Sequence, residues 1–171
     1  PAILWNDGRT TEECDYLNNV IGKEKLSEYT ANISFTGFTA PKVLWVKNKE
    51  PENFARIKKI MLPKDYINYI LTGVHACDYS DASGMLLLDV QHRCWNKKML
   101  DICGISETQM PRLFESYDCI GNVDPVVADM LGIAQEEIPE EEQYYFQGFE
   151  PHMHCGGLRF PRVASLYPET I

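Results

Sequence analysis

The stretch Pro1-Ala-Ile-Leu-Trp-Asn-Asp-Gly-Arg9 opens the sequence and decides how the rest of the chain is interpreted. Residues 2–5 form a short apolar run that ends at polar residues and Gly8, a pattern typical of a buried strand. In open α/β sheets, ligands bind at the edge formed by the carboxyl ends of the strands. The stretch therefore predicts a strand that delivers the Trp-Asn-Asp triplet to a binding edge.

The composition is that of a single globular domain, since 44% of the 171 residues are hydrophobic and 24% are charged. The formal net charge of −9 argues against nucleic acid or an anionic membrane as the main partner, because both are rich in phosphate. The six cysteines include no Cys-x-x-Cys pair, so we expect reduced thiols in a cytoplasmic protein. No apolar run approaches the ~18 residues that a membrane-spanning helix needs, and no membrane span is predicted.

Local signals predict a chain in which helices alternate with strands. Thr10 and Glu13 match a capping box for a helix that ends at Gly22, and a second helix begins near Thr39 and ends before Pro51. The other predicted elements are a strand over residues 59–63, a helix over residues 64–71, a loop over residues 78–84 that leads into the apolar run 85–88, and helices opened by Asn96, Ser106 and Asp124. This order of elements predicts an α/β fold.

Five separated motifs then carry a resemblance to a known family. They are Ala2-Ile-Leu-Trp-Asn-Asp-Gly-Arg9, Thr36-Gly-Phe-Thr-Ala-Pro-Lys-Val-Leu-Trp-Val46, Leu62-Pro-Lys-Asp-Tyr66, Leu71-Thr-Gly73 and Ser80-Asp-Ala-Ser-Gly84. With these motifs in this order, residues 1–134 resemble the xylulokinases of the FGGY family of carbohydrate kinases. The resemblance implies part of an N-terminal domain of the ribonuclease-H-like (actin and hexokinase) type, in which sugar and nucleotide meet between two domains.

The resemblance also implies an activity, the ATP-dependent phosphorylation of D-xylulose, with ATP and Mg²⁺ used by the complete enzyme. Phosphoryl transfer needs a general base, a metal ion and backbone donors around the phosphates. The family carries these on an Asp-x-Gly-Thr hairpin and a Gly-Gly-Gly-Asp loop, and neither string occurs in the 171 residues. We therefore expect a fragment that has no catalytic residue of its own, binds neither ATP nor Mg²⁺ tightly and is inactive by itself.

The resemblance places Trp5 and Asp7 near the sugar pocket. An indole packs against the apolar face of a sugar, whereas carboxylate and amide groups bind its hydroxyls. We predict that Trp5, Asn6 and Asp7 bind substrate and that Thr36 and Phe38 border the same cleft. The alternatives are that Trp5 belongs to the core, that Asn6 and Asp7 cap the following turn, and that Thr36 and Phe38 only cap and pack.

The remaining charged residues are interpreted as structural. Asp78, Asp81 and Asp89 lack the spacing of an EF-hand loop, so they are expected to be solvated turn carboxylates and not metal ligands. Lys42 is expected to lie exposed on the outer face of a helix, since a lysine in the first turn of an amphipathic helix usually does. Arg9 is expected to form a structural ion pair.

Residues 135–171 do not resemble the family. Residues 135–143 form an acidic tract typical of a solvated linker, and residues 142–148 have the shape of a processing-protease site such as expression tags carry. His152, His154 and Cys155 could bind zinc or copper, although chance spacing is the preferred interpretation. Two alternatives to a kinase fragment therefore remain: a noncatalytic sugar-binding or scaffold fragment, and a metal-binding protein that acts through this tail. The sequence also leaves open a homo-oligomer or association with a missing domain.

Overall fold

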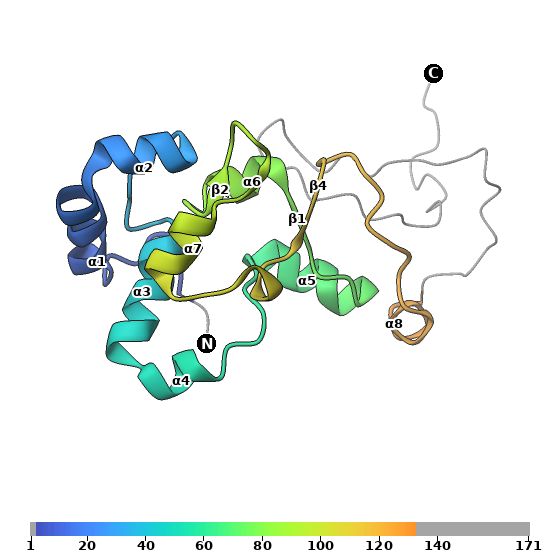
Figure 1. The fold of residues 1–171 in the computed structure, drawn as a ribbon. Helices are drawn as coiled ribbons and strands as arrows, with labels where there is room; N and C mark the ends of the chain where they lie inside the picture. The colour runs from blue at the N-terminus through green and yellow to red at the C-terminus, as the bar shows by residue number, and fades with distance from the viewer. Residues whose placement is uncertain (1–2, 133–171) are drawn as a thin grey trace, which may run out of the picture.

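The structure is a computed structural model that describes residues 3–132 (Figure 1). The acidic linker and the proposed metal ligands His152, His154 and Cys155 lie outside these residues. In chain order, the elements are α1 (Thr11–Asp15), the π-helix η1 (Tyr16–Gly22), α2 (Lys23–Thr30), α3 (Thr39–Lys49), α4 (Pro51–Ala55), α5 (Pro63–Thr72), β1 (Ala76–Asp78), α6 (Tyr79–Ser83), β2 (Leu88–Asp89), β3 (Cys94–Trp95), α7 (Lys97–Cys103), the 3-10 helix η2 (Glu107–Gln109), β4 (Arg112–Phe114) and α8 (Pro125–Met130). None of the helices in this part of the chain is long and apolar enough to cross a membrane.

Helix and strand are both present, as the sequence predicts, but the described strands are short. β1 pairs with β4 in parallel, with Ala76 opposite Arg112 and Asp78 opposite Phe114, and β2 pairs with β3 in antiparallel fashion. A parallel pair needs a crossover connection of about a dozen residues or more, which the segment from α6 to η2 supplies. Asp78 therefore stands at the carboxyl end of a parallel strand, directly before a helix.

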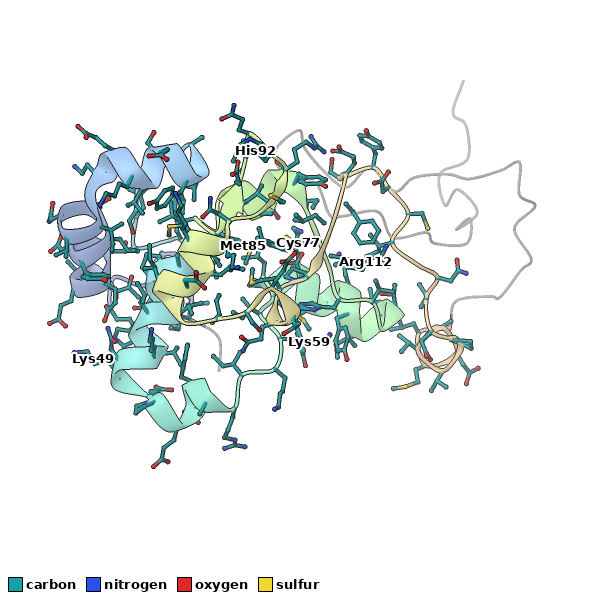
Figure 2. The ribbon with its side chains drawn as sticks, in the orientation of Figure 1. Lys49, Lys59, Cys77, Met85, His92 and Arg112 are labelled. Atoms are coloured by element: carbon teal, nitrogen blue, oxygen red, sulfur yellow. The ribbon has the colours of Figure 1, made fainter. Side chains whose placement is uncertain are left out.

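The hydrophobic core is centred on residues 85–88, which are almost completely buried. Figure 2 shows Met85 near the middle of the molecule, whereas Lys49 lies at its periphery. Ala40 N donates to the Met85 carbonyl at 3.0 Å, so the backbone of the apolar run is tied to the start of α3. The residues packed around it include Leu17, Leu26, Val43, Leu44, Met99, Leu100 and Cys103.

Helices with strong local signals occur where the sequence predicts them. The Asn96 side chain accepts a hydrogen bond from Met99 N at 3.1 Å at the start of α7, and Gly104 ends that helix with φ 75°. Asp124 caps α8 through Val126 N at 2.8 Å. Glycine tolerates a positive φ without the steric cost that other residues pay, which explains this choice of stop residue.

The predicted opening strand is wrong for its described residues. Residues 3–5 form no strand, and Leu4 is 66% exposed. Asp7 N instead donates to the Leu4 carbonyl at 3.2 Å and closes a turn. A strand is defined by its ladder of hydrogen bonds, and no strand of residues 3–132 pairs with this segment.

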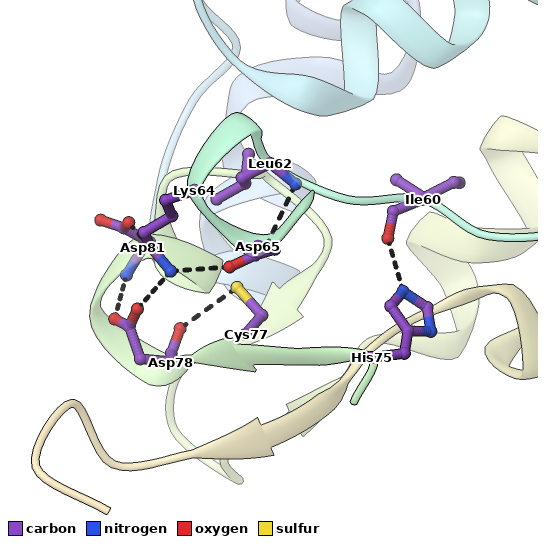
Figure 3. Close-up of polar contacts among 8 residues, drawn as sticks. All are labelled: Ile60, Leu62, Lys64, Asp65, His75, Cys77, Asp78 and Asp81. Carbon is purple, nitrogen blue, oxygen red and sulfur yellow. Dashed lines mark hydrogen bonds and ion pairs between the residues drawn. The ribbon is translucent and has the colours of Figure 1, made fainter. Parts of the chain in front are cut away.

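The strand predicted over residues 59–63 is also wrong, because its backbone groups bind elsewhere. Ile60 N donates to the Gln109 carbonyl at 2.9 Å, and the side chain of Gln109 donates back to the Ile57 carbonyl at 2.9 Å. The His75 ring lies 2.9 Å from the Ile60 carbonyl (Figure 3). An extended segment is thus fixed by a 3-10 turn and a histidine instead of a sheet.

The capping box predicted at Thr10 and Glu13 does not form. Thr10 Oγ1 donates to the Thr36 carbonyl at 3.2 Å, and the buried Glu13 accepts from Asn48 Nδ2 at 3.1 Å. Gly22 does not end the helical region either, because α2 follows it directly. Hydrogen bonds to α3 and to the segment before it therefore replace the local cap.

The loop predicted over residues 78–84 contains a helix. Asp78 Oδ1 accepts from Asp81 N at 2.9 Å and caps α6, whose residue Ala82 is fully buried. Aspartate favours both turns and helix N-caps, so the same residues are compatible with either structure. Burial against the core selects the helix.

Candidate functional site

The turn at residues 4–7 displays two of the predicted site residues to solvent. The Trp5 side chain is 79% exposed, and Asn6 beside it is also exposed. The alternative that Trp5 belongs to the core is therefore wrong. A large apolar ring in this position is available to a ligand or to another part of a larger protein.

Asp7 is held in place by its neighbour Arg9. Arg9 N donates to Asp7 Oδ1 at 2.9 Å, and the guanidinium binds Oδ2 through Nε at 2.9 Å and Nη2 at 2.8 Å. These hydrogen bonds hold the pKa of the Asp7 carboxyl below its ordinary value. Asp7 therefore caps the turn that follows it, which was the alternative interpretation of this residue, and Arg9 forms an ion pair, as predicted. The carboxylate remains 24% exposed and ionised, with lone pairs left for further donors.

The guanidinium of Arg9 is fixed in turn by α3. Its central carbon lies 5.0 Å from the centre of the Trp45 ring, a cation–π contact. Trp45 thus supports Arg9 from the helix side, and Arg9 orients Asp7. The sequence gives no local signal for this contact, since Trp45 lies far along the chain.

A second turn, over residues 35–38, borders the first. Phe38 N donates to the Phe35 carbonyl at 3.0 Å, and the two rings meet edge to face with centroids 5.4 Å apart. Phe38 occupies the N-cap position of α3 and packs against the core, so the packing alternative holds for this residue. Phe35 is exposed and extends the aromatic surface, and the sequence did not single it out.

The two turns contact each other through their backbones. A Cβ atom on Gly37 would lie 2.9 Å from the Trp5 carbonyl oxygen, so only glycine permits this approach. The Thr36 carbonyl accepts from Thr10 Oγ1 at 3.2 Å. Residues 5–7 and 36–38, far apart in sequence, therefore form neighbouring parts of one surface.

Lys42 lies beneath this surface and is half-buried, so its predicted exposure is wrong. Its Nζ donates to the Gly37 carbonyl at 2.8 Å. Burial lowers the pKa of Lys42, while the negative charge of Asp7 acts in the opposite direction. Lys42 and Trp45 are three residues apart on α3 and therefore share a face of the helix, which is the sequence signal that could have linked them.

The chemistry of this surface suits a ligand that is partly apolar and partly hydroxylated. An exposed indole offers a flat apolar face, and the ionised Asp7 accepts hydrogen bonds from hydroxyl groups. Asn6 adds an exposed amide that can donate and accept. These three groups come from one turn, and the turn at residues 35–38 bounds them.

A second charged cluster, the Lys64 cluster, consists of Lys64, Asp65, Asp78 and Asp81 (Figure 3). Lys64 Nζ lies 2.7 Å from Asp65 Oδ1, 2.6 Å from Asp78 Oδ2 and 3.3 Å from Asp81 Oδ2. Asp65 and Asp78 are buried, so the expectation of a solvated carboxylate is wrong for Asp78. Burial alone would lower the pKa of Lys64, but the charge of Asp65 and the hydrogen bonds to Asp65 and Asp78 raise it.

The cavity beside this cluster is too small for a sugar. Its volume is about 10 Å³, and Cys77, Asp78 and Phe114 are among its lining residues. A space of this size holds roughly one water molecule. Burial raises the pKa of the Cys77 thiol well above its ordinary value, which makes this cysteine a poor nucleophile. The Lys64 cluster is therefore interpreted as a structural element.

Residues 3–132 contain no group of three or more His, Cys, Asp or Glu side chains that could hold a metal ion. Asp89, the third carboxylate considered from the sequence, binds exposed His92 at 3.0 Å. Asp78 and Asp81 are bound to Lys64, which competes with any cation. The described residues thus do not fit a Mg²⁺ ion.

Comparison with known proteins gives a consistent result. The model of the FGGY family of carbohydrate kinases, N-terminal domain, matches residues 1–139. Xylulose kinase of Escherichia coli (strain K12) is 46% identical over 134 residues, which cover 78% of this chain and 27% of that protein. The solved structure of a xylulose kinase from Brucella ovis superposes with a TM-score of 0.72 at 39% identity, over 77% of this chain and 27% of the other. A gluconate kinase from Lactobacillus acidophilus gives the same TM-score of 0.72 and the same coverage at 26% identity. The chain thus spans 27% of the length of these relatives.

Proposed function

The chain belongs to the FGGY family of carbohydrate kinases, and we propose that it supplies the sugar-facing part of a xylulose kinase. The complete enzyme would transfer a phosphoryl group from ATP to D-xylulose. Support for the sugar comes from the names of the relatives, which include xylulose kinases 46% and 43% identical to this chain. The fold alone does not select the sugar, since a gluconate kinase superposes equally well.

The observation that carries the proposal is the pairing of an exposed indole with an oriented carboxylate. The indole of Trp5 would pack against the C–H face of the sugar, and Asp7 would accept hydrogen bonds from its hydroxyls. Asn6 would add an amide contact. Thr36 and Phe38 would border the pocket through their turn and not through direct polar contacts.

The phosphoryl-transfer step itself would use groups that residues 3–132 do not provide. ATP and Mg²⁺ would supply the phosphoryl group and charge neutralisation in the complete enzyme. The described residues themselves do not fit a metal ion. In a coupled assay with D-xylulose and ATP, the 171-residue chain alone should give no turnover, and robust turnover would contradict this part of the proposal.

Calorimetric titration of the 171-residue chain with D-xylulose tests the sugar site. We expect weak, saturable binding that falls by roughly tenfold in Trp5→Ala and in Asp7→Asn, because each removes one main contact. Tyr117→Ala is the matched control, since Tyr117 is a similarly exposed aromatic residue away from these turns. No binding, or equal binding by all variants, would overturn the site. Titration with gluconate and glycerol then tests the choice of sugar.

A further inference from the structure

Lys42 occupies a position that its place in the sequence does not suggest. It stands in the first turn of α3, yet its ammonium group is half-buried and reaches back to the Gly37 carbonyl at 2.8 Å. An ammonium group carries three donors, and this contact uses one of them. The contact fixes the middle of the turn at residues 35–38, at the point where Gly37 meets the Trp5 carbonyl.

Lys42 also acts on Asp7. The two charges attract each other, although no ion pair joins them directly among the described residues. Arg9 contacts both oxygens of the Asp7 carboxylate and lies over the Trp45 ring, and Glu50 is a further acid that acts on Arg9. Asp7 is therefore held by Arg9 directly, and the charge of Lys42 acts on it in the same direction as that of Arg9.

Helix α3 is the common support of both turns and packs beside α1 (Figure 1). Trp45 supports the Arg9–Asp7 pair, and Lys42, three residues earlier on the same face, ties down the turn at residues 35–38. We propose that Lys42 is a positioning residue of the sugar site: its ammonium group fixes the turn at residues 35–38 relative to the Asp7 carboxylate. This inference rests on the proposed function, because it concerns how the same site binds its sugar.

The physical reason for a lysine at this position is that one group performs two tasks. A neutral donor could bind the Gly37 carbonyl, but it would not stabilise the ionised form of Asp7. A cation without a donor toward Gly37 would leave the turn free to move away from Trp5. The flexible four-carbon stem lets the ammonium group reach across the first turn of the helix while its apolar part stays buried.

The experiment is a titration of the full chain with D-xylulose over a pH series from neutral to about 3. Lys42→Met removes charge and donors but keeps the apolar stem, and Lys42→Arg restores both charge and donors. We expect Lys42→Met to weaken binding by roughly tenfold at neutral pH, the effect of losing a hydrogen bond from a charged group. We also expect the acid limb of the binding curve to move to higher pH, because the Asp7 carboxylate is easier to protonate without the nearby cation. Lys42→Arg should reverse both changes.

Lys49→Met is the matched control on the same helix. Lys49 pairs with the exposed Glu12 at 3.1 Å, away from the two turns, so its loss should leave affinity and pH profile unchanged. Unchanged affinity in Lys42→Met overturns the inference. Weaker binding with an unmoved acid limb and no rescue by Lys42→Arg also overturns it, since that pattern indicates general destabilisation. If Lys42→Met does not fold, Lys42→Gln gives the same test of the acid limb. Absence of binding by the unsubstituted chain overturns the sugar site itself and is thus distinct from these results.

Discussion

Two charged regions of the molecule combine basic and acidic side chains in opposite proportions. At the surface formed by residues 5–7 and 35–38, Arg9 pairs with the single carboxylate of Asp7, which stays 24% exposed, and the charge of Lys42 acts on the same carboxylate. In the Lys64 cluster, one ammonium group is surrounded by the carboxylates of Asp65, Asp78 and Asp81. Where cations are in excess, a carboxylate is oriented and left accessible to a ligand. Where carboxylates are in excess around a half-buried lysine, their contacts with it hold consecutive elements of the chain together.

The elements that supply the charges support this difference. Lys64 and Asp65 start α5, Asp78 ends β1 and Asp81 lies in α6, so the Lys64 cluster joins three consecutive elements (Figure 3). Its two buried carboxylates depend on the one lysine for their countercharge. At the surface formed by residues 5–7 and 35–38, the Arg9–Asp7 pair lies in an exposed turn where solvent screens it, and the half-buried Lys42 comes from α3. Removal of a cation should therefore affect folding in one region and binding in the other.

The largest effect is expected for Lys64→Met. The substitution leaves Asp65 and Asp78 buried without their cation, which typically costs about 3–5 kcal/mol. Total stability of a domain is about 5–15 kcal/mol, so the variant should be largely destabilised. Urea denaturation followed by circular dichroism measures the loss. Lys58→Met, at an exposed position, is the control and should change the free energy of unfolding little. Equal stability of both variants would contradict the structural role of the cluster.

A smaller effect of a different kind is expected for Arg9→Met. Because the Arg9–Asp7 pair is exposed, its loss should leave the unfolding curve nearly unchanged. The affinity for D-xylulose should fall by roughly tenfold, since Asp7 loses the contacts that orient it. The acid limb of binding should also move to higher pH, because the hydrogen bonds that lower the Asp7 pKa are gone. Arg56→Met, another exposed arginine, controls for general charge effects, and a large loss of stability in Arg9→Met would erase the contrast between the two regions.

The helices were largely predictable because their signals are local. Asn96, Gly104 and Asp124 act within one turn of their own helices, and the structure uses them as expected. The two failed strands depended on partners that the sequence does not reveal. Ile60 N is bound by the carbonyl of Gln109, about fifty residues later, and residues 3–5 have no strand partner among the described residues. Strand prediction fails here because a strand forms only when two segments pair through hydrogen bonds, and the sequence of one segment does not reveal its partner.

The candidate site, like the fold, could be predicted from the sequence only in part. Trp5 and Asp7 were singled out through the resemblance to the family, and the structure shows Trp5 exposed and Asp7 oriented by Arg9. Lys42 was expected to lie in solvent because a lysine in the first turn of an amphipathic helix usually does, whereas its side chain folds back onto the Gly37 carbonyl five residues earlier. The spacing of Lys42 and Trp45 places them on one face of α3, but only the fold shows that this face lies under the two turns.

The smallest effect is expected for Asp81→Asn, and it tests whether the Lys64 cluster carries a surplus carboxylate. Burial raises the pKa of Asp81 and the charge of Asp78 adds to it, although Lys64 at 3.3 Å opposes both. Between the ordinary and the raised pKa, the folded state binds more protons than the unfolded state, so the free energy of unfolding falls as pH rises through this range. Asparagine has no proton to lose, and this part of the pH dependence should vanish.

At neutral pH, Asp81→Asn should be as stable as the unsubstituted chain or slightly more stable. The difference should stay below about 1 kcal/mol, because the Asp81 side chain is 47% exposed and solvent screens its charge. Urea denaturation at several pH values between about 3 and 7 provides the comparison, with Asp101→Asn on the exposed face of α7 as the control. A loss of more than about 2 kcal/mol at neutral pH would mean that the pair with Lys64 outweighs burial and repulsion. All three carboxylates would then be needed to hold the lysine. A neutral result leaves Asp65 and Asp78 as the partners whose burial makes Lys64 necessary.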